Sequence, residues 1–175
     1  MKILVAGVGN VFFSDDGFGS EVARRLLAAP GALPPSVDVV DVGIRGMHLA
    51  YQVLDGYEAL VVVDAAPQLD DTAPGEPGTL TLVEHVLTAA TGDAAFDPHG
   101  MEPDAVLDLV GALARGVGEG GLDRVLVLGC VPADVGAGMG LSPPVAAAVD
   151  EAVDAVGRIV ERLIEHRPFT EVGAS

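Results

Sequence analysis

The order of apolar and amphipathic segments predicts an α/β protein, a three-layer α/β/α sandwich around a twisted, mostly parallel sheet of about five strands. Short runs rich in valine, leucine and isoleucine alternate with segments of helical periodicity, and loops rich in glycine or proline separate them. With 175 residues, half of them apolar, the chain is long enough for one hydrophobic core. We therefore expect a single domain over residues 1–167, followed by a short polar tail over residues 168–175.

The expected elements follow from two periodicities and from the residues that interrupt them. Residues 2–8 form a continuous apolar run, the pattern of a strand buried on both faces of a parallel sheet. Phe18, Val22 and Leu26 recur at helical spacing, which predicts the first helix. By these criteria we expect strands at residues 2–8, 37–41, 59–63, 79–83 and 124–129, and helices at residues 16–29, 47–54, from about 103 to 115 and from 143 onward.

Local signals place two of these elements more closely. Residues 79–83 alternate between polar and apolar side chains, so this strand is expected at an edge of the sheet. Ser142 followed by Pro143 predicts the N-cap and the first turn of the last helix. Apolar positions from Val145 to Leu163 then keep the helical period, and we expect them to line the core.

The charge balance and the apolar pattern exclude several classes of protein. Nine basic residues against twenty-six acidic ones give a formal charge of −17, which would repel nucleic acid and anionic membrane surfaces. The chain has no apolar run long enough to span a membrane, and its start lacks the apolar stretch of a signal peptide. We therefore expect a cytoplasmic protein that binds neither nucleic acid nor membrane. Cys130, the only cysteine, excludes an internal disulfide and a cysteine-based zinc cluster.

Candidate functional residues lie in loops that follow the expected strands, because open α/β sheets bind ligands beyond the carboxyl ends of their strands. Asp64 directly follows three consecutive valines, where a ligand site and a structural turn explain it equally well. Asp15 and Asp16 stand at the start of the first helix, where acids commonly cap free amides and complement the helix dipole. His99 lies in a polar loop and, taken alone, looks like an ordinary surface histidine.

Two other chemistries are conceivable from single segments. The glycine-rich residues 7–10 are typical of a nucleotide-binding turn, but Phe12 occupies the place of that fingerprint's third glycine, and no Walker-type lysine motif occurs. Cys130 could be a nucleophile, although an isolated cysteine after a buried strand is more often a small buried hydrophobic residue. Arg45, in the turn at residues 43–46, could bind a carboxylate or simply be solvated.

Seven segments, common one by one, are distinctive in their order and spacing, and together they span most of the chain. They are residues 3–10, 15–19, 43–47, 63–65, 98–99, 129–132 and 140–143. In this arrangement the sequence resembles the nickel–iron hydrogenase maturation endopeptidases, the family that removes a C-terminal extension from the hydrogenase large subunit.

The resemblance implies a set of functional residues. In the family, an acid on the first loop, an aspartate after the third strand and a histidine on a later loop bind metal, and these fall on Asp16, Asp64 and His99. The first acid is glutamate in some members and aspartate in others, and whether Asp15 assists Asp16 stays open. The turn after the second strand is our candidate for contacting the substrate, through Gly43, Arg45, Gly46 and Met47.

The resemblance also implies that the metal is nickel already bound in the cysteine-lined site of the hydrogenase large-subunit precursor. Two carboxylates and one imidazole suit nickel, zinc or manganese, and three ligands leave positions open for substrate and water. Because the sequence lacks the His-Glu-x-x-His motif of permanent zinc sites, no permanently bound metal is expected. The metal would polarise the scissile carbonyl and activate a water, while one carboxylate manages the proton.

The preferred interpretation of the sequence is therefore a metal-dependent endopeptidase that acts on a hydrogenase large-subunit precursor. Two alternatives stay open at this point. The first is a non-catalytic assembly factor of the same fold, which would bind the precursor without cutting it. The second is a nucleotide-binding or small-molecule-binding α/β domain.

Overall fold

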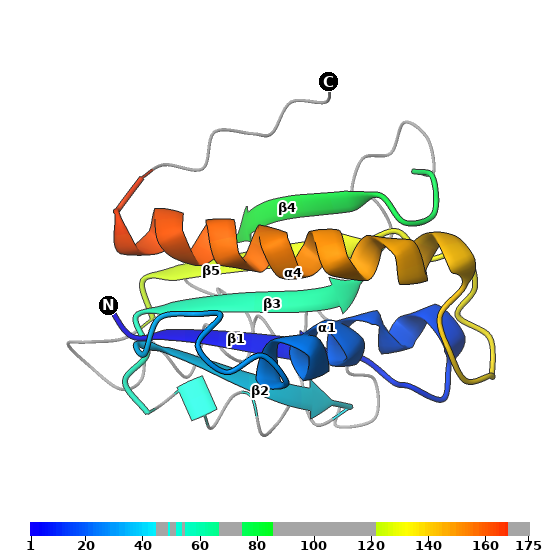
Figure 1. Cartoon of the computed structure of the whole chain (residues 1–175), viewed down its shortest axis with the longest axis horizontal. Helices are drawn as coiled ribbons and strands as arrows, with labels where there is room; N and C mark the ends of the chain where they lie inside the picture. Colours follow the sequence, from blue (N-terminus) through cyan, green and yellow to red (C-terminus); the bar gives the residue numbers. More distant parts are fainter. Residues whose placement is uncertain (45–48, 50–51, 54, 67–74, 86–121, 168–175) are drawn as a thin grey trace, which may run out of the picture.

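The structure, a computed structural model, shows strands and helices in the expected layered arrangement (Figure 1). It describes the whole chain except residues 45–48, 50–51, 54, 67–74, 86–121 and 168–175. The elements of the described part are β1 (Ile3–Val8), the 3-10 helix η1 (Ser14–Gly17), α1 (Phe18–Leu27), β2 (Val37–Gly43), β3 (Ala59–Ala65), β4 (Leu80–His85), β5 (Arg124–Cys130) and α4 (Pro143–Ile164).

The five strands form one sheet in the order β2-β1-β3-β5-β4. β1, β2, β3 and β5 run parallel to their neighbours, whereas β4 runs antiparallel to β5 at one edge. The carboxyl ends of the parallel strands therefore meet at one end of the sheet, on the right in Figure 1. This topology confirms the predicted mostly parallel α/β sheet and the edge position of its antiparallel strand.

All five expected strands are present, and the differences lie at their ends. β3 continues through Asp64 and Ala65, although the apolar run stops at Val63, because Ala65 still pairs with Cys130 of β5. β4 and β5 also end later than expected, at His85 and Cys130. Backbone pairing with a neighbour thus extends each strand past the point where the sequence pattern stops.

The first helix begins later than predicted. Residues 14–17 form the 3-10 turn η1, and α1 starts only at Phe18, where the prediction placed the helix start at residue 16. Neither η1 nor α1 has a side-chain hydrogen bond at its N-cap. The structural alternative for Asp15 and Asp16, in which they cap helix amides, does not apply, because both carboxylates accept hydrogen bonds from loop amides instead.

Two further helix predictions fall largely outside the described residues. Of the short helix expected at residues 47–54, the structure describes Leu49, Gln52 and Val53, all three helical. The helix expected from about residue 103 to 115 and the polar tail at residues 168–175 lie outside the described part.

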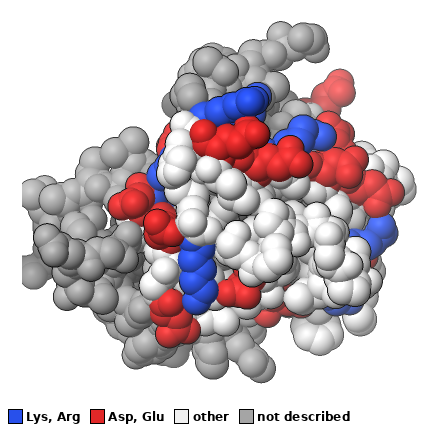
Figure 2. All heavy atoms as spheres, turned by 60° about the vertical axis from the view of Figure 1, so that its left-hand side comes forward, with Lys and Arg blue, Asp and Glu red and all other residues white. Residues whose placement is uncertain are grey.

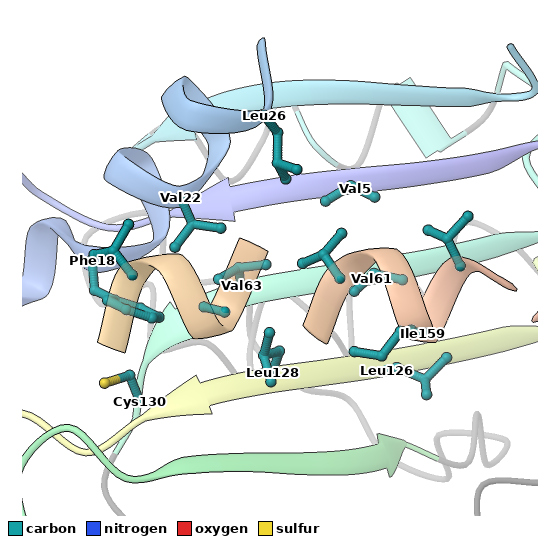
Figure 3. Packing of buried hydrophobic residues seen from close by; sticks show 14 of the residues in the cluster. Val5, Phe18, Val22, Leu26, Val61, Val63, Leu126, Leu128, Cys130 and Ile159 are labelled. Carbon is teal, nitrogen blue, oxygen red and sulfur yellow. The ribbon is translucent and has the colours of Figure 1, made fainter. Parts of the chain in front are cut away.

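The main core lies between the sheet and helices α1 and α4, which pack side by side on one face (Figures 1 and 3). Phe18, Val22 and Leu26 of α1 point into this core, as their spacing predicted (Figure 3). Burying one such side chain contributes roughly 1.5–3 kcal/mol. The long helix α4 buries Val145, Ala148, Val149, Ala152, Val156, Ile159, Val160 and Leu163.

The start of α1 lies unusually close to the sheet. A Cβ atom built on Gly19 would overlap the carbonyl oxygens of Val8 and Val63. A Cβ atom on Gly7 would in turn overlap the carbonyl oxygen of Gly19. Only glycine permits this backbone-to-backbone approach. The two glycines thereby place η1, which directly precedes α1, at the carboxyl ends of β1 and β3.

The opposite face of the sheet carries a second set of buried apolar residues. Leu4, Leu60 and Val62 point to this face and pack in one cluster with Leu49 and Tyr57. Alternation along β3 puts Asp64 on the same face as Leu60 and Val62.

The face shown in Figure 2 carries acidic side chains, with fewer basic ones among them, around an uncharged central area. This distribution agrees with the formal charge of −17. No helix in the described part of the chain is long and apolar enough to cross a membrane.

Candidate active site

Asp16 and Asp64 come together at the carboxyl ends of β1 and β3. Asp16 belongs to η1, which the backbone contacts of Gly19 hold against the sheet, and Asp64 is the penultimate residue of β3. Gly9 lies between them: a Cβ atom there would overlap the Asp16 carbonyl oxygen and lie 3.8 Å from Asp64 Oδ1. The structure therefore brings together two of the three residues predicted to bind metal.

The environment of Asp64 is unfavourable for a bare carboxylate. Burial, and next the negative charge of Asp16, raise the pKa of Asp64 to about 7, against a smaller opposite effect of the Ala65 amide. Within the described part of the chain, no ion pair involves Asp16 or Asp64. Two neighbouring carboxylates without a counter-charge favour binding of a cation, and their hard oxygen atoms suit a divalent metal.

The third predicted ligand, His99, lies outside the described residues. Among the residues that the structure does describe, no three His, Cys, Asp or Glu side chains gather into a metal site. The described residues thus supply a pair of acids, and the complete triad stays a prediction.

The predicted substrate-contact turn is described only at its first residue. Gly43 ends β2 with a positive φ of 56°, and its carbonyl oxygen accepts a 3.0 Å hydrogen bond from the Gly9 amide. This contact places Gly43 beside the loop that carries Asp16. Arg45, Gly46 and Met47 lie outside the described residues, so the role of the turn stays a prediction.

The glycine-rich loop after β1 is built to hold a carboxylate and lacks the features of a phosphate site. Its amides are already used: Gly9 donates to Gly43, Asn10 donates to Asp16 Oδ2 at 2.9 Å, and Phe12 donates to Asn10 Oδ1. A phosphate cradle needs such amides free and pointing at the ligand. This arrangement argues against the nucleotide-binding alternative.

Asp15 has a structural role that differs from that of its neighbour Asp16. Its side chain is fully buried and accepts hydrogen bonds from the amides of Ala133, Asp134 and Ser142, at 2.7–3.0 Å, and from the Ser142 hydroxyl at 2.8 Å. These four bonds join η1 to the loop between β5 and α4. Asp15 is therefore committed to holding two loops together, and Asp16 is the acid directed toward Asp64.

The pKa of Asp15 agrees with this role. Burial alone would raise the pKa of this carboxyl, but the hydrogen bonds from Ser142, Asp134 and Ala133 together lower it below its usual value. Ser142 is the N-cap residue of α4 and Pro143 begins the helix, as predicted, but the Ser142 hydroxyl donates to Asp15 and makes no capping hydrogen bond. No local sequence pattern predicts this pairing, because 127 positions separate the two residues.

A family model described as hydrogenase maturation protease matches residues 21–159. The chain belongs to the hydrogenase maturation protease family. This finding confirms the resemblance that the sequence motifs carried, and with it the enzyme class.

Individual members of the hydrogenase maturation protease family match over most of the chain. The hydrogenase expression/formation protein HupD of Rhodobacter capsulatus is 32% identical over 157 residues, covering 87% of this chain and 68% of HupD. The hydrogenase 2 maturation protease of Escherichia coli is 29% identical over 156 residues, covering 89% and 88% of the two chains. The crystal structure of a hydrogenase 2 maturation peptidase from a Thaumarchaeota archaeon superposes with a TM-score of 0.66, at 28% identity, covering 92% of this chain and 99% of that one.

Cys130 is unsuited to be the nucleophile of this hydrogenase maturation protease. Its thiol is fully buried in the main core, and burial, followed by the charge of Asp15, raises its pKa to about 11. A thiol needs a lowered pKa and access to substrate in order to attack a peptide bond. The interpretation of Cys130 as a small buried hydrophobic residue therefore holds.

Gly9 and Asn10, which contact the acidic pair, also line a hollow of about 510 Å³. Asn10 and Phe12 line one side, and Asp41 of β2 lies on another. Asp41 accepts a 2.7 Å hydrogen bond from the buried Ser20 hydroxyl and lies 3.9 Å from Arg24. Our sequence analysis missed Asp41, although the rule that selected Asp64, an acid near the carboxyl end of a strand, could have found it.

Proposed function

We propose that this protein is a metal-dependent endopeptidase that removes the C-terminal extension from the nickel-loaded large-subunit precursor of a nickel–iron hydrogenase. Family membership supports the reaction class, and the pairing of Asp16 with the buried Asp64 supports the metal dependence. In this proposal Asp16, Asp64 and His99 bind the metal, and the turn from Gly43 to Met47 contacts the precursor.

Nickel is part of the substrate in this proposal. Two carboxylates and an imidazole are donors that Ni²⁺ accepts, and with only three ligands from the protease, coordination positions stay available for the precursor. Since the site is incomplete without the precursor, the purified protease is expected to carry far less than one equivalent of metal. A precursor that lacks nickel would fail to engage the acids and would stay uncut.

Each described residue has a defined task in such a reaction. The Asn10 amide fixes Asp16 through Oδ2, so that this carboxylate faces the end of β3. Asp64 is held at the end of a fully paired strand, away from bulk water, where its charge acts more strongly than at the surface. The nickel supplies polarisation of the scissile carbonyl and an acidified water, and the protein supplies the position and the exclusion of solvent.

The proposal is tested by incubating the protein with nickel-loaded and nickel-free precursor and following the precursor's C-terminus by intact mass spectrometry. Loss of a C-terminal peptide from the nickel-loaded form only is the expected result. Asp16→Ala and His99→Ala should abolish this cleavage, and Asp154→Ala, which changes an exposed acid of α4, is the matched control. Cleavage of both precursor forms would remove nickel as the recognition signal, and cleavage of neither would favour a non-catalytic assembly factor.

A further inference from the structure

The exposed large apolar side chains are concentrated beside the acidic pair. Seven such residues occur in the described part of the chain: Phe12, Phe13, Leu27, Ile44, Val135, Met139 and Ile164. All but Leu27 and Ile164 belong to loops at the carboxyl ends of the parallel strands. Phe12 is 63% exposed and Met139 is 77% exposed, which is unusual for side chains of this size. Clustered exposed apolar residues mark interaction surfaces more often than scattered ones do.

Four of these residues belong to two loops that pair through their backbones. Phe13 and Gly138 form a parallel bridge, and the Gly138 amide donates to the Phe12 carbonyl at 2.9 Å. Ser14 donates twice to the second loop, from its amide to Gly138 and from its hydroxyl to Gly136. We call Phe12, Phe13, Val135 and Met139 the loop-pair surface. Figure 1 shows the two loops adjacent to each other at the carboxyl end of the sheet.

The loop-pair surface is held in one conformation, although it is made of loops. Asp15 adds its four hydrogen bonds to the second loop directly behind the surface. Ser14 keeps a left-handed backbone, with φ of 51°, because both of its donors are engaged across the loop pair. A surface that is ordered before it binds loses little conformational entropy on binding.

The surface is also free of charge in a strongly charged protein. Residues 10–14 and 135–141 contain no Asp, Glu, Lys or Arg, whereas charged residues make up 20% of the chain. Two copies of this protein, each with a formal charge of −17, repel one another, which disfavours a second copy as the partner. Phe12 precedes Asp16 by only four positions, in the loop that leads into η1. A partner bound at Phe12 therefore lies near the acidic pair.

We propose that the loop-pair surface binds an apolar segment of the hydrogenase precursor next to the bond that is cut. This inference rests on the proposed function and adds a specificity-determining surface to it. Phe12 also lines the 510 Å³ hollow, together with the exposed Ile44 and with Asn10, whose amide donates to Asp16, so the bound segment continues from the loop-pair surface into this hollow. Residues of this surface contribute to substrate affinity and leave the chemical step unchanged.

The test compares a Phe12→Ser/Met139→Ser double variant with wild type on nickel-loaded precursor. We expect KM to rise about 10-fold, a typical loss when exposed apolar anchors are truncated, with kcat within about 2-fold of wild type. Leu27→Ser is the matched control, because Leu27 is 54% exposed at the far end of α1, and it should leave both constants unchanged. If the double variant fails to fold, Met139→Gln replaces it, because this change keeps the side-chain length at a highly exposed position. It should also raise KM.

The outcomes separate this inference from the proposed function. If wild type cuts the precursor and the loop-pair variants show an unchanged KM, the docking surface is wrong and the endopeptidase assignment stands. A fall in kcat at constant KM would also overturn the inference, because it would mean that the loops only shape the site. If wild type cuts no precursor, the proposed function fails first. A dimer in analytical ultracentrifugation that the Phe12→Ser/Met139→Ser variant dissociates would assign the surface to a second copy and overturn the proposal.

Discussion

Asp15 and Asp16 are adjacent in sequence, yet the structure places them in opposite environments. The Asp15 carboxylate is surrounded by four donors, which lower its pKa and join two loops. The Asp16 carboxylate instead faces the buried Asp64, whose pKa it helps to raise. Burial alone therefore does not identify a functional acid. A buried carboxylate that accepts several hydrogen bonds stabilises the fold, whereas one with few donors favours binding of a cation.

The largest expected effect is a loss of cleavage activity when Asp64 is changed. Asp64→Asn should lower the rate of precursor cleavage by about 10³-fold, equivalent to about 4 kcal/mol, because the proposed metal site would lose one of its carboxylates. The same change should leave the melting temperature unchanged or raise it, since it removes repulsion between two acids. Cleavage assays by intact mass and thermal unfolding by circular dichroism measure the two quantities. An unfolded Asp64→Asn variant would show that the acid is structural, contrary to our assignment.

The next effect concerns stability. Asp15→Ala removes the acceptor of three partly buried hydrogen bonds from backbone amides, so we expect it to lower the free energy of unfolding by about 3 kcal/mol. Ser142→Ala removes only the hydroxyl donor and should cost about 1 kcal/mol. Urea denaturation of the two variants beside wild type gives both values. Equal losses in the two variants would contradict the assignment of the amide hydrogen bonds as the main contribution.

The third expected effect is an opposite pH dependence of the two sites. Because the pKa of Asp15 is lowered on folding, its contribution is present above the unfolded value of about 3.8 and is lost as the pH falls through the folded value. Because folding raises the pKa of Asp64 to about 7, ionised Asp64 costs stability increasingly as the pH rises from about 4 to 7.

Unfolding measured from pH 3 to pH 8 separates the two sites. The advantage of wild type over Asp15→Asn should shrink below about pH 4, and the advantage of Asp64→Asn over wild type should grow between about pH 4 and 7. Parallel curves for wild type and Asp64→Asn over that interval would contradict the raised pKa of Asp64.

Much of the fold was predictable because its signals are local. The apolar runs at residues 2–8, 59–63 and 124–129 each mark a strand that the sheet buries. The edge strand β4 was recognised by its polar and apolar alternation, and α4 by its helical period. Strand ends and the start of α1 were less predictable, because backbone pairing and the tight contacts of Gly7 and Gly19 determine them.

The sequence by itself determined the fold class, the family and the choice of Asp16, Asp64 and His99 as candidate site residues, since motif order and strand-end position are properties of the chain. Only the tertiary structure showed that Asp15, next to Asp16, has a separate role in joining two loops. Their difference depends on donors from Ala133, Asp134 and Ser142, which lie more than a hundred residues away along the chain and reach Asp15 only when β5 and α4 are in place. The same long-range pairing creates the loop-pair surface, because two uncharged loops become one apolar face only where the folded sheet brings their backbones together.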